Sequence, residues 1–438
     1  MGKLKAGIGK VDITPFVGTE LCGYGVYLKR KARAIHDDLY ARAVVLDDGS
    51  TRVALATTDI VGVVKETVDR ARSLISYKTG IRKDNIIICA SHTHSGPATA
   101  GLMRGWGEPN IEYLDTLPTR IADAVIVAAE NLKEARIGFG RGRIDSISFN
   151  RVENPDWSEI EKEEGTIDPE VGVVSIENTE GEPLAILFNF ACHGITIDYR
   201  TEDGKTVSAD YPGYAERMLE QHNESAVAMF LQGACGDINP RYKWRSYTEM
   251  AKTGKILADE VSRVHKEIRT ISDIKMRMRH QVIGLPYDLP SLEEMGKLMV
   301  EKVKQLSQYS HKENSKEARR AKFYAGWANQ MFVKLENNPE KEMKTEIQAL
   351  EINDTILVTV PGELFVEFGL KIKEEIPHKN VLVVGYANDF VGYIPTEKDF
   401  ENNGYAAKMV PQIIGNFPFV KNVGSILTEK ILKLVHFL

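Results

Sequence analysis

The chain has 438 residues, of which 43% are hydrophobic and 27% charged, and its formal net charge is -6. This composition is that of a globular protein with a sizeable core, and the length allows one large domain or two to three ordinary ones. A modest negative charge with both signs interspersed speaks against a nucleic-acid partner.

The N-terminus, the apolar runs and the cysteines bear on the expected location. No apolar stretch approaches the roughly 18–20 residues that span a bilayer, so we expect no transmembrane segment. The N-terminal sequence MGKLKAGIGKVDITP lacks the apolar h-region of a secretory signal. No CxxC pair occurs among the four cysteines, which are Cys22, Cys89, Cys192 and Cys235. We therefore expect a reduced, cytoplasmic protein.

The first elements in chain order are a buried strand with its exit loop over 52–63 and a helix over 64–80 that Gly80 ends. Five further apolar runs each lead into a loop rich in Gly, Pro, His, Asp or Glu, within 85–97, 183–196, 226–240, 355–365 and 380–396. Strands alternating with helices predict an α/β fold, with a mixed β-sheet core and surrounding helices. Because ligands bind beyond the carboxyl ends of strands in such sheets, we expect the functional site there.

Residues 290–345 have a different pattern, with two amphipathic stretches joined by the polar SHKENS. They predict a helical hairpin inserted in the main domain. The hairpin either covers the site or simply packs on the sheet. No internal repeat or low-complexity linker divides the chain, so we treat 1–438 as one domain.

The segment SHTHSGP, Ser91 to Pro97, carries two histidines at alternate positions after a buried strand. Alternate side chains of an extended segment face the same way, so His92 and His94 can point into one cavity. A strand-end loop is a common place for binding residues. A metal or catalytic role competes here with a simple pair of loop-capping histidines.

Two more strand-end residues are candidate ligands. His193 in FACHGIT follows an apolar strand, as His92 does, although a lone histidine at a strand end is often only a satisfied polar residue. Glu363 in VPGELF follows another strand, where the alternative is an acid in the first turn of a helix. Zinc accepts His nitrogen and carboxylate oxygen, so the set indicates a metal hydrolase. His36 could line a substrate pocket or serve a turn.

In these motifs the chain resembles the neutral (non-lysosomal) ceramidase family. The resemblance runs through VDITPFVG, LYARAVVLDDG, SHTHSGP, FACHGIT, SADYPGYAERMLE, QGACGDINPR, PGELF and NDFVGYIPT, in that order. It implies a Zn²⁺ ion bound by two His, one Glu and one Tyr, which are His92, His193, Glu363 and Tyr393 here.

The resemblance also implies the roles of further residues. His94 matches the family's catalytic histidine, Tyr405 its second tyrosine, and Arg151 in FNRVEN its active-site arginine. We expect Asp59 and Asp237 either to orient the ligand histidines or to serve turns and caps. The family's GDVSPN serine, which contributes to the substrate site, is Asn239 here, and Asn offers an amide instead of a hydroxyl.

The expected function is zinc-dependent hydrolysis of a linear amide bond in a small-molecule or lipid-like N-acyl substrate. The C-terminal β-sandwich domain of true ceramidases is expected to be absent from this chain. Two alternatives stay open, a hydrolase of a different small amide or ester and a non-catalytic metal-binding protein. There is no P-loop and no GxSxG elbow to favour a nucleotide or serine-hydrolase site.

Overall fold

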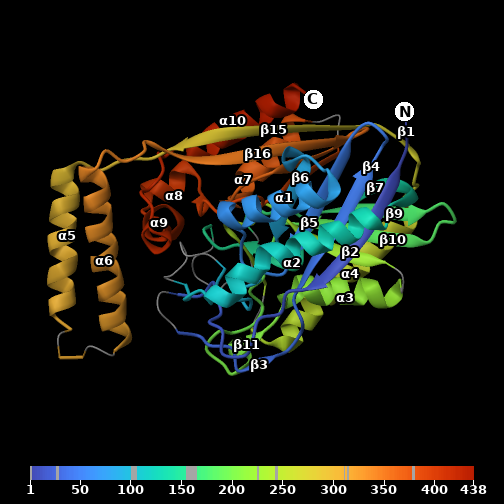
Figure 1. Cartoon of the computed structure of the whole chain (residues 1–438). Helices are drawn as coiled ribbons and strands as arrows, with labels where there is room; N and C mark the ends of the chain where they lie inside the picture. Colours follow the sequence, from blue (N-terminus) through green and yellow to red (C-terminus); the bar gives the residue numbers. More distant parts are fainter. Residues whose placement is uncertain are drawn as a thin grey trace.

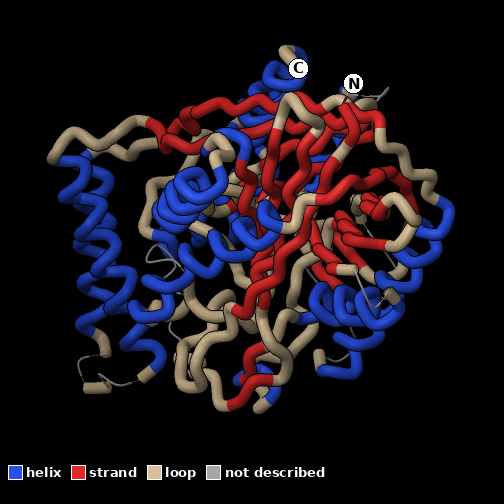
Figure 2. Tube along the Cα trace, turned by 45° about the vertical axis from the view of Figure 1, so that its right-hand side comes forward, coloured by secondary structure: helices blue, strands red, loops and turns tan. Residues whose placement is uncertain are grey.

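The computed structural model describes residues 2–25, 29–99, 106–153, 165–223, 226–241, 245–309, 311–312, 315–376 and 380–438. Two β-sheets pack face to face, and helices cover the outer face of each, so the fold has four layers (Figure 1 and Figure 2). The predicted α/β fold is confirmed. The division of the strands between two sheets is a feature that the sequence pattern did not predict.

The larger sheet has eight strands in the order β12-β10-β9-β7-β2-β4-β5-β6. They are β2 Lys5–Asp12, β4 Tyr40–Asp47, β5 Arg52–Thr58, β6 Ile86–Ala90, β7 Lys133–Arg143, β9 Glu170–Asn178, β10 Pro183–Phe190 and β12 Val227–Gln232. Only the pairs β5–β6 and β10–β12 are parallel. Because both faces are covered, β4 and β6 are continuous buried runs and do not alternate apolar and polar residues.

The smaller sheet has four strands in the order β15-β16-β17-β19. They are β15 Met276–Pro286, β16 Glu342–Ile352, β17 Thr355–Thr359 and β19 Asn380–Val384. Leucines of the two sheets meet in one apolar cluster, where Leu187 and Leu231 of the larger sheet join Leu350 and Leu382 of the smaller one. Burial of such side chains on both sides of the interface holds the two sheets together.

Six long helices form the outer layers. Against the larger sheet lie α1 Lys65–Thr79, α2 Ile111–Glu130, α3 Asp210–His222 and α4 Tyr247–Glu267, and against the smaller sheet lie α7 Val366–Glu375 and α10 Val423–His436. The predicted helix over 64–80 is confirmed as α1. Gly80 ends it in the left-handed conformation, with φ 74, and its N–H donates to the Ser76 carbonyl.

Short elements complete the fold. The two-residue and three-residue strands are β1 Gly2–Lys3 with β14 Asp273–Ile274, β3 Ala34–Ile35 with β11 Thr206–Val207, β8 Ser148–Asn150 with β13 Ile238–Pro240, and β18 Glu363–Leu364 with β20 Tyr393–Ile394. The short helices are η1 Lys83–Asn85, η3 Asp203–Lys205, α8 Glu397–Glu401, the π-helix η4 Tyr405–Met409 and α9 Val410–Ile414.

The predicted helical hairpin is confirmed as α5 Leu292–Ser307 and α6 Lys316–Glu336, inserted between β15 and β16. It extends beyond the end of the sheets beside α8 and α9, so the expectation that it packs on the face of the sheet is wrong (Figure 1). Its base packs against Phe417 through Met295 and Trp327. Of the predicted linker, residues 310, 313 and 314 lie outside the described residues.

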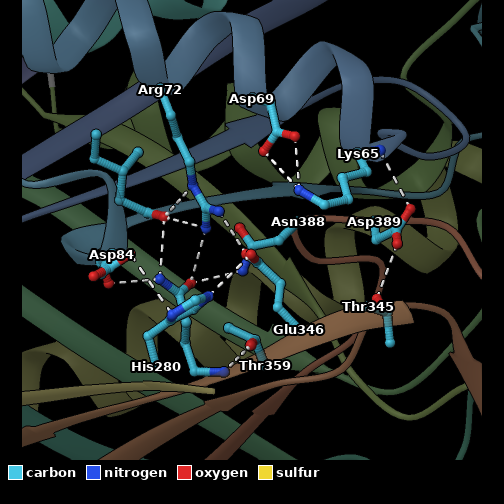
Figure 3. Close-up of polar contacts among 12 residues, drawn as sticks. Lys65, Asp69, Arg72, Asp84, His280, Thr345, Glu346, Thr359, Asn388 and Asp389 are labelled. Atoms are coloured by element: carbon cyan, nitrogen blue, oxygen red, sulfur yellow. Dashed lines mark hydrogen bonds and ion pairs between the residues drawn. The ribbon is translucent and has the colours of Figure 1, made fainter. Parts of the chain in front are cut away.

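A buried polar network joins α1 to the smaller sheet (Figure 3). Arg72 of α1 forms a 2.5 Å ion pair with Glu346 of β16, and its Nη2 donates to the Ile86 carbonyl at 2.6 Å. His280 of β15 lies 3.0 Å from the same carboxylate through Nε2. The network therefore ties three elements together at the edge of the two sheets. Within the described ranges, no helix combines the length and apolar character that a bilayer crossing requires.

Candidate active site

The carboxyl ends of strands from both sheets meet at one buried centre. His92 follows β6, His193 follows β10, and Glu363 follows β17, as the sequence predicted. The Nε2 atoms of His92 and His193 each lie 3.4 Å from the same Glu363 oxygen, Oε2. All three side chains are almost fully buried. The predicted convergence of these residues, far apart in the sequence, is therefore present in the fold.

Main-chain carbonyls orient the two histidines. His92 Nδ1 lies 2.6 Å from the Val61 carbonyl oxygen, and His193 Nδ1 lies 2.7 Å from that of Cys235 and 3.0 Å from that of Ile238. A carbonyl only accepts, so each Nδ1 carries the proton and each Nε2 presents a lone pair to the centre. The backbone at His92 adopts φ 64, in the left-handed region that residues other than glycine seldom occupy.

The two acids that we considered as orienters, Asp59 and Asp237, serve other contacts. Asp59 pairs with Arg42 at 2.7 Å and accepts from the Tyr40 N–H at 2.8 Å. Asp237 accepts from the Val366 N–H at 2.8 Å, at the start of α7. Among the contacts described, neither acid bonds a ligand histidine. Asp237 fits the cap role, whereas Asp59 belongs to a buried ion pair, which is neither of the two alternatives. Burial raises the pKa of Asp237 to about 7.

His94 joins the same cluster. Its Nε2 lies 3.0 Å from Nε2 of His92, and one ligand atom from each of His92, His94 and His193 falls within 4.8 Å of the others. Burial, followed by the neighbouring histidines, holds the pKa of His94 well below its usual value. The imidazole is therefore neutral at pH 7 and can accept a proton. By distance alone, His94 could equally belong to a metal-ligand set.

Glu363 and Tyr393 reach the centre from two short strands. Burial alone would raise the pKa of Glu363, but the adjacent His92 and His193 lower it to about 2, so the group is a carboxylate. The Tyr393 hydroxyl oxygen accepts from Arg151 Nη2 at 2.9 Å. Burial raises the pKa of Tyr393 well above its usual value, and its hydrogen bond with Glu363 raises it further.

Arg151 and Tyr405 lie beside Tyr393. Arg151 also donates from Nη2 to the Gly236 carbonyl at 2.7 Å, and its guanidinium lies 5.5 Å from the Tyr393 ring and 6.0 Å from the Tyr405 ring. Tyr405 begins η4, and its ring centre is 6.1 Å from that of Tyr393. Tyr405 is 40% exposed, whereas the four ligand candidates are buried.

The two predicted substrate residues differ in their placement. Asn239 of β13 is fully buried, and neither its Oδ1 nor its Nδ2 has a hydrogen-bond partner among the described residues. It directly follows Ile238, whose carbonyl orients His193. His36 instead stacks on Tyr247, with ring centres 3.8 Å apart, and its Nδ1 lies 2.6 Å from Asp37. No contact described for His36 joins it to the cluster, so its substrate role stays a prediction.

The sequence pattern did not identify two residues of the centre, Tyr386 and Gln232. The Tyr386 ring stacks on His92 at 4.0 Å and 24°, and its hydroxyl lies 3.4 Å from Glu363 Oε2. Gln232 donates from Nε2 to the Ser91 and Cys192 carbonyls, at 3.1 and 2.8 Å, and thereby ties the two histidine loops together. Both follow the rule used for the histidines, since each lies at or just after a strand end.

The donor set fits a divalent metal ion. Two imidazole nitrogens, one carboxylate oxygen and one phenol oxygen converge, and the Nε2 atom of His193 is buried without a hydrogen-bond partner among the described residues. Zinc prefers this mixture of nitrogen and oxygen donors, with protonated Nδ1 atoms held by acceptors behind the ligands.

Comparisons with known proteins agree on one family. A family model described as "Neutral/alkaline non-lysosomal ceramidase, N-terminal" matches residues 4–341. The neutral ceramidase of Pseudomonas aeruginosa is 27% identical over 252 aligned positions, and the alignment covers 53% of this chain and 36% of the relative. Neutral ceramidase A of Dictyostelium discoideum is 26% identical over 263 aligned positions, and this alignment covers 53% of this chain and 35% of the relative. The matched region thus spans well under half of either relative.

The crystal structure of neutral ceramidase from Pseudomonas aeruginosa has the same fold. It superposes with a TM-score of 0.74 at 20% sequence identity, over 99% of this chain and 74% of that one. Since the family model covers most of the chain, this protein belongs to the neutral/alkaline non-lysosomal ceramidase family.

Proposed function

We propose that the chain hydrolyses a linear amide bond in an N-acyl, lipid-like substrate, with Zn²⁺ held by His92, His193, Glu363 and Tyr393. The observation that carries the proposal is the approach of two buried Nε2 atoms to one carboxylate oxygen, at 3.4 Å each. Membership of the ceramidase family supports the reaction class.

Zinc in such a site acidifies water and polarises a carbonyl oxygen. The residues of the chain provide the rest of the chemistry. The neutral imidazole of His94 accepts a proton from the attacking water and passes it to the leaving amine. Its Nε2 points toward the cluster, 3.0 Å from His92, so the proton is taken and returned at the reacting centre.

Tyr405 donates a hydrogen bond to the oxyanion that develops on the substrate carbonyl. Arg151 lies against both tyrosine rings and bonds the Tyr393 hydroxyl, so it holds the ligand tyrosine and adds positive charge beside the oxyanion. Loss of one oxyanion donor typically lowers the rate by about 10²–10³.

The relatives are named neutral ceramidases, which makes ceramide the first substrate to test. Asn239 supports an alternative, hydrolysis of a different small amide or ester. A buried amide that has no hydrogen-bond partner among the described residues offers both a donor and an acceptor to a polar group of the substrate.

A panel of N-acyl substrates tests the proposal directly. The zinc-loaded protein is assayed against ceramide, N-acyl amino compounds, small amides and esters, with the chelated protein as the control. We expect turnover of at least one N-acyl amide, lost on chelation and restored by Zn²⁺. Full zinc occupancy with no turnover of any acyl substrate would instead indicate a non-catalytic metal-binding protein.

A further inference from the structure

Arg30 is a buried arginine, and each hydrogen bond described for its guanidinium goes to a main-chain carbonyl. Nη2 donates to the carbonyl of Cys22 at 2.6 Å and to that of His94, and Nη1 donates to that of Gly204 at 2.8 Å. Its exposed fraction is 6%. One guanidinium therefore joins the loop that carries His94 to the segments of Cys22 and Gly204.

The charge of Arg30 has no acidic counterpart among the described residues. Burial lowers its pKa to about 10, with only Tyr24 and Cys22 opposing the shift. A buried cation without a counter-ion is costly to the fold. The planar fork of five donors suits Arg to holding several carbonyls at once, which one ammonium group does less well.

The ring of His94 is enclosed by the loop that Arg30 holds. Gly23 has φ +105, and a Cβ at this position would lie 2.5 Å from Cγ and Nδ1 of His94. The Tyr24 ring meets the imidazole edge to face at 4.9 Å, and the Arg30 guanidinium lies 4.9 Å from the Tyr24 ring. Only glycine permits both this backbone conformation and this close approach.

His94 differs from the two ligand histidines in how it is oriented. The Nδ1 atoms of His92 and His193 are bound by carbonyls, whereas Nδ1 of His94 is buried without a hydrogen-bond partner among the described residues. In the part of the chain that the structure describes, no carboxylate or carbonyl binds the ring through this second nitrogen. Its position is left to the main chain of the loop and to packing against Gly23 and Tyr24.

We propose that Arg30 is a positioning residue for His94. It binds the His94 carbonyl directly, and it binds the Cys22 carbonyl, which precedes the two residues, Gly23 and Tyr24, that pack against the imidazole. The proposal rests on the proposed function in one respect, the role of His94 in proton transfer. Displacement of a catalytic group by about 1 Å can cost about 10²-fold in rate. Arg30 therefore acts on kcat without touching substrate or metal.

Lysine substitutions of two buried arginines form a matched pair. Arg30→Lys should lower kcat by at least ~10-fold, with KM within about threefold and zinc content unchanged, since only the orientation of His94 is lost. Arg72→Lys is the control, because Arg72 is also buried and also donates to a main-chain carbonyl, that of Ile86, but lies in the network of Figure 3. It should lose stability and keep kcat.

Two further variants sharpen the test. Arg30→Ala should lose about 100-fold in kcat and recover part of it with added guanidinium, which can occupy the space of the lost side chain. Gly23→Ala should lower kcat while leaving Arg30 in place. Wild-type kcat in both Arg30 variants would overturn the proposal, as would equal effects of Arg30→Lys and Arg72→Lys on kcat.

Hydrogen exchange gives a readout that needs no turnover. The amides of His92 and His94 donate to the carbonyls of Ile60 and Gly194. Arg30→Lys should speed exchange in 91–97 and leave the strand over 86–90 protected. If the parent protein turns over no acyl substrate, the proposed function is wrong. If Arg30→Lys leaves amide hydrogen exchange in 91–97 unchanged, the positioning role of Arg30 is wrong, whatever the outcome of the activity assay.

Discussion

Glu363 and Tyr393 face each other as direct register partners in the parallel pair β18–β20, although α7 and β19 lie between them in the chain. Register partners in a sheet present their side chains to the same face. The pairing therefore delivers a carboxylate and a phenol side by side to the Nε2 atoms of the two histidines. The backbone of this pair belongs to neither large sheet.

Tyr393→Phe removes the phenol oxygen while keeping the ring. We expect at least ~10-fold weaker zinc binding, because one donor is lost and Arg151 loses the acceptor that it bonds at 2.9 Å. Competition with a chelator measures the change in affinity. Tyr287→Phe is the control, since Tyr287 stacks on Phe419 near the base of the hairpin and should leave zinc binding unaltered. Unchanged affinity in Tyr393→Phe would remove Tyr393 from the ligand set.

Two alanine variants distinguish the metal ligand from the proton acceptor in the segment His92-Thr93-His94. His92→Ala should lose zinc, because its Nε2 is one of the two nitrogens aimed at Glu363. His94→Ala should keep zinc and lose activity by about 10²–10⁴, the usual contribution of a general acid–base group. Metal analysis and kcat/KM are measured on the same samples. Loss of zinc in His94→Ala would instead place His94 among the ligands, in a set of three histidines.

Much of the centre follows from the sequence because each strand is short, apolar and ended by a distinctive loop. The strand preceding His92 is confirmed as β6 and that preceding His193 as β10. The sequence pattern does not indicate which strands pair with one another in a sheet. β12 and β17 read alike as buried runs, yet they lie in different sheets.

The residues that support the centre were missed for a similar reason. Tyr386 has φ 53 and Arg30 bonds carbonyls from distant loops, and neither property has a local signature in the sequence. The orienting groups behind His92 and His193 are main-chain carbonyls, which every residue possesses. Residue type therefore could not identify these orienting carbonyls, and the sequence instead offered the acids Asp59 and Asp237 as candidates for the role.

Glu346→Gln tests the network of Figure 3. Burial alone would raise the pKa of Glu346, but His280 and Arg72 hold it below its usual value. A carboxyl group with a depressed folded pKa stabilises the protein above its unfolded pKa, and this stabilisation is lost as the pH falls through the folded pKa. At pH 7 the variant should lose about 3–5 kcal/mol, since Arg72 is left buried and unpaired.

Urea unfolding from neutral to acidic pH measures this effect. The gap in free energy of unfolding between parent and Glu346→Gln should narrow as the pH drops below about 4.3, the ordinary pKa of Glu. Glu293→Gln is the control, because the exposed Glu293–Lys297 pair is worth at most ~0.5 kcal/mol. A gap that stays constant with pH would mean that the charge on Glu346 adds nothing to stability.

The helical hairpin can be deleted at the point where the two strands that flank it, β15 and β16, pair with each other. β15 and β16 pair as far as Pro286 and Glu342, and the Tyr287 N–H donates to the Lys341 carbonyl at 2.9 Å. Replacing 288–340 by Asn-Gly therefore offers a two-residue turn of the kind that closes antiparallel hairpins. The four-stranded sheet should form without the insertion.

The shortened protein should keep its zinc, because no residue of α5 or α6 is among the ligand candidates. It should lose stability, since Phe417 is covered by Met295 and Trp327, and exposing one such side chain costs about 1.5–3 kcal/mol. The deletion also removes one side of a cavity of about 510 Å³, which Met295 and Trp327 line together with Phe400 of α8 and Pro411 of α9. Zinc stoichiometry and the denaturation midpoint are measured, with Val333→Ala on the exposed face of α6 as a neutral control. Loss of zinc on deletion would contradict this prediction and would show that the hairpin helps to shape the metal site.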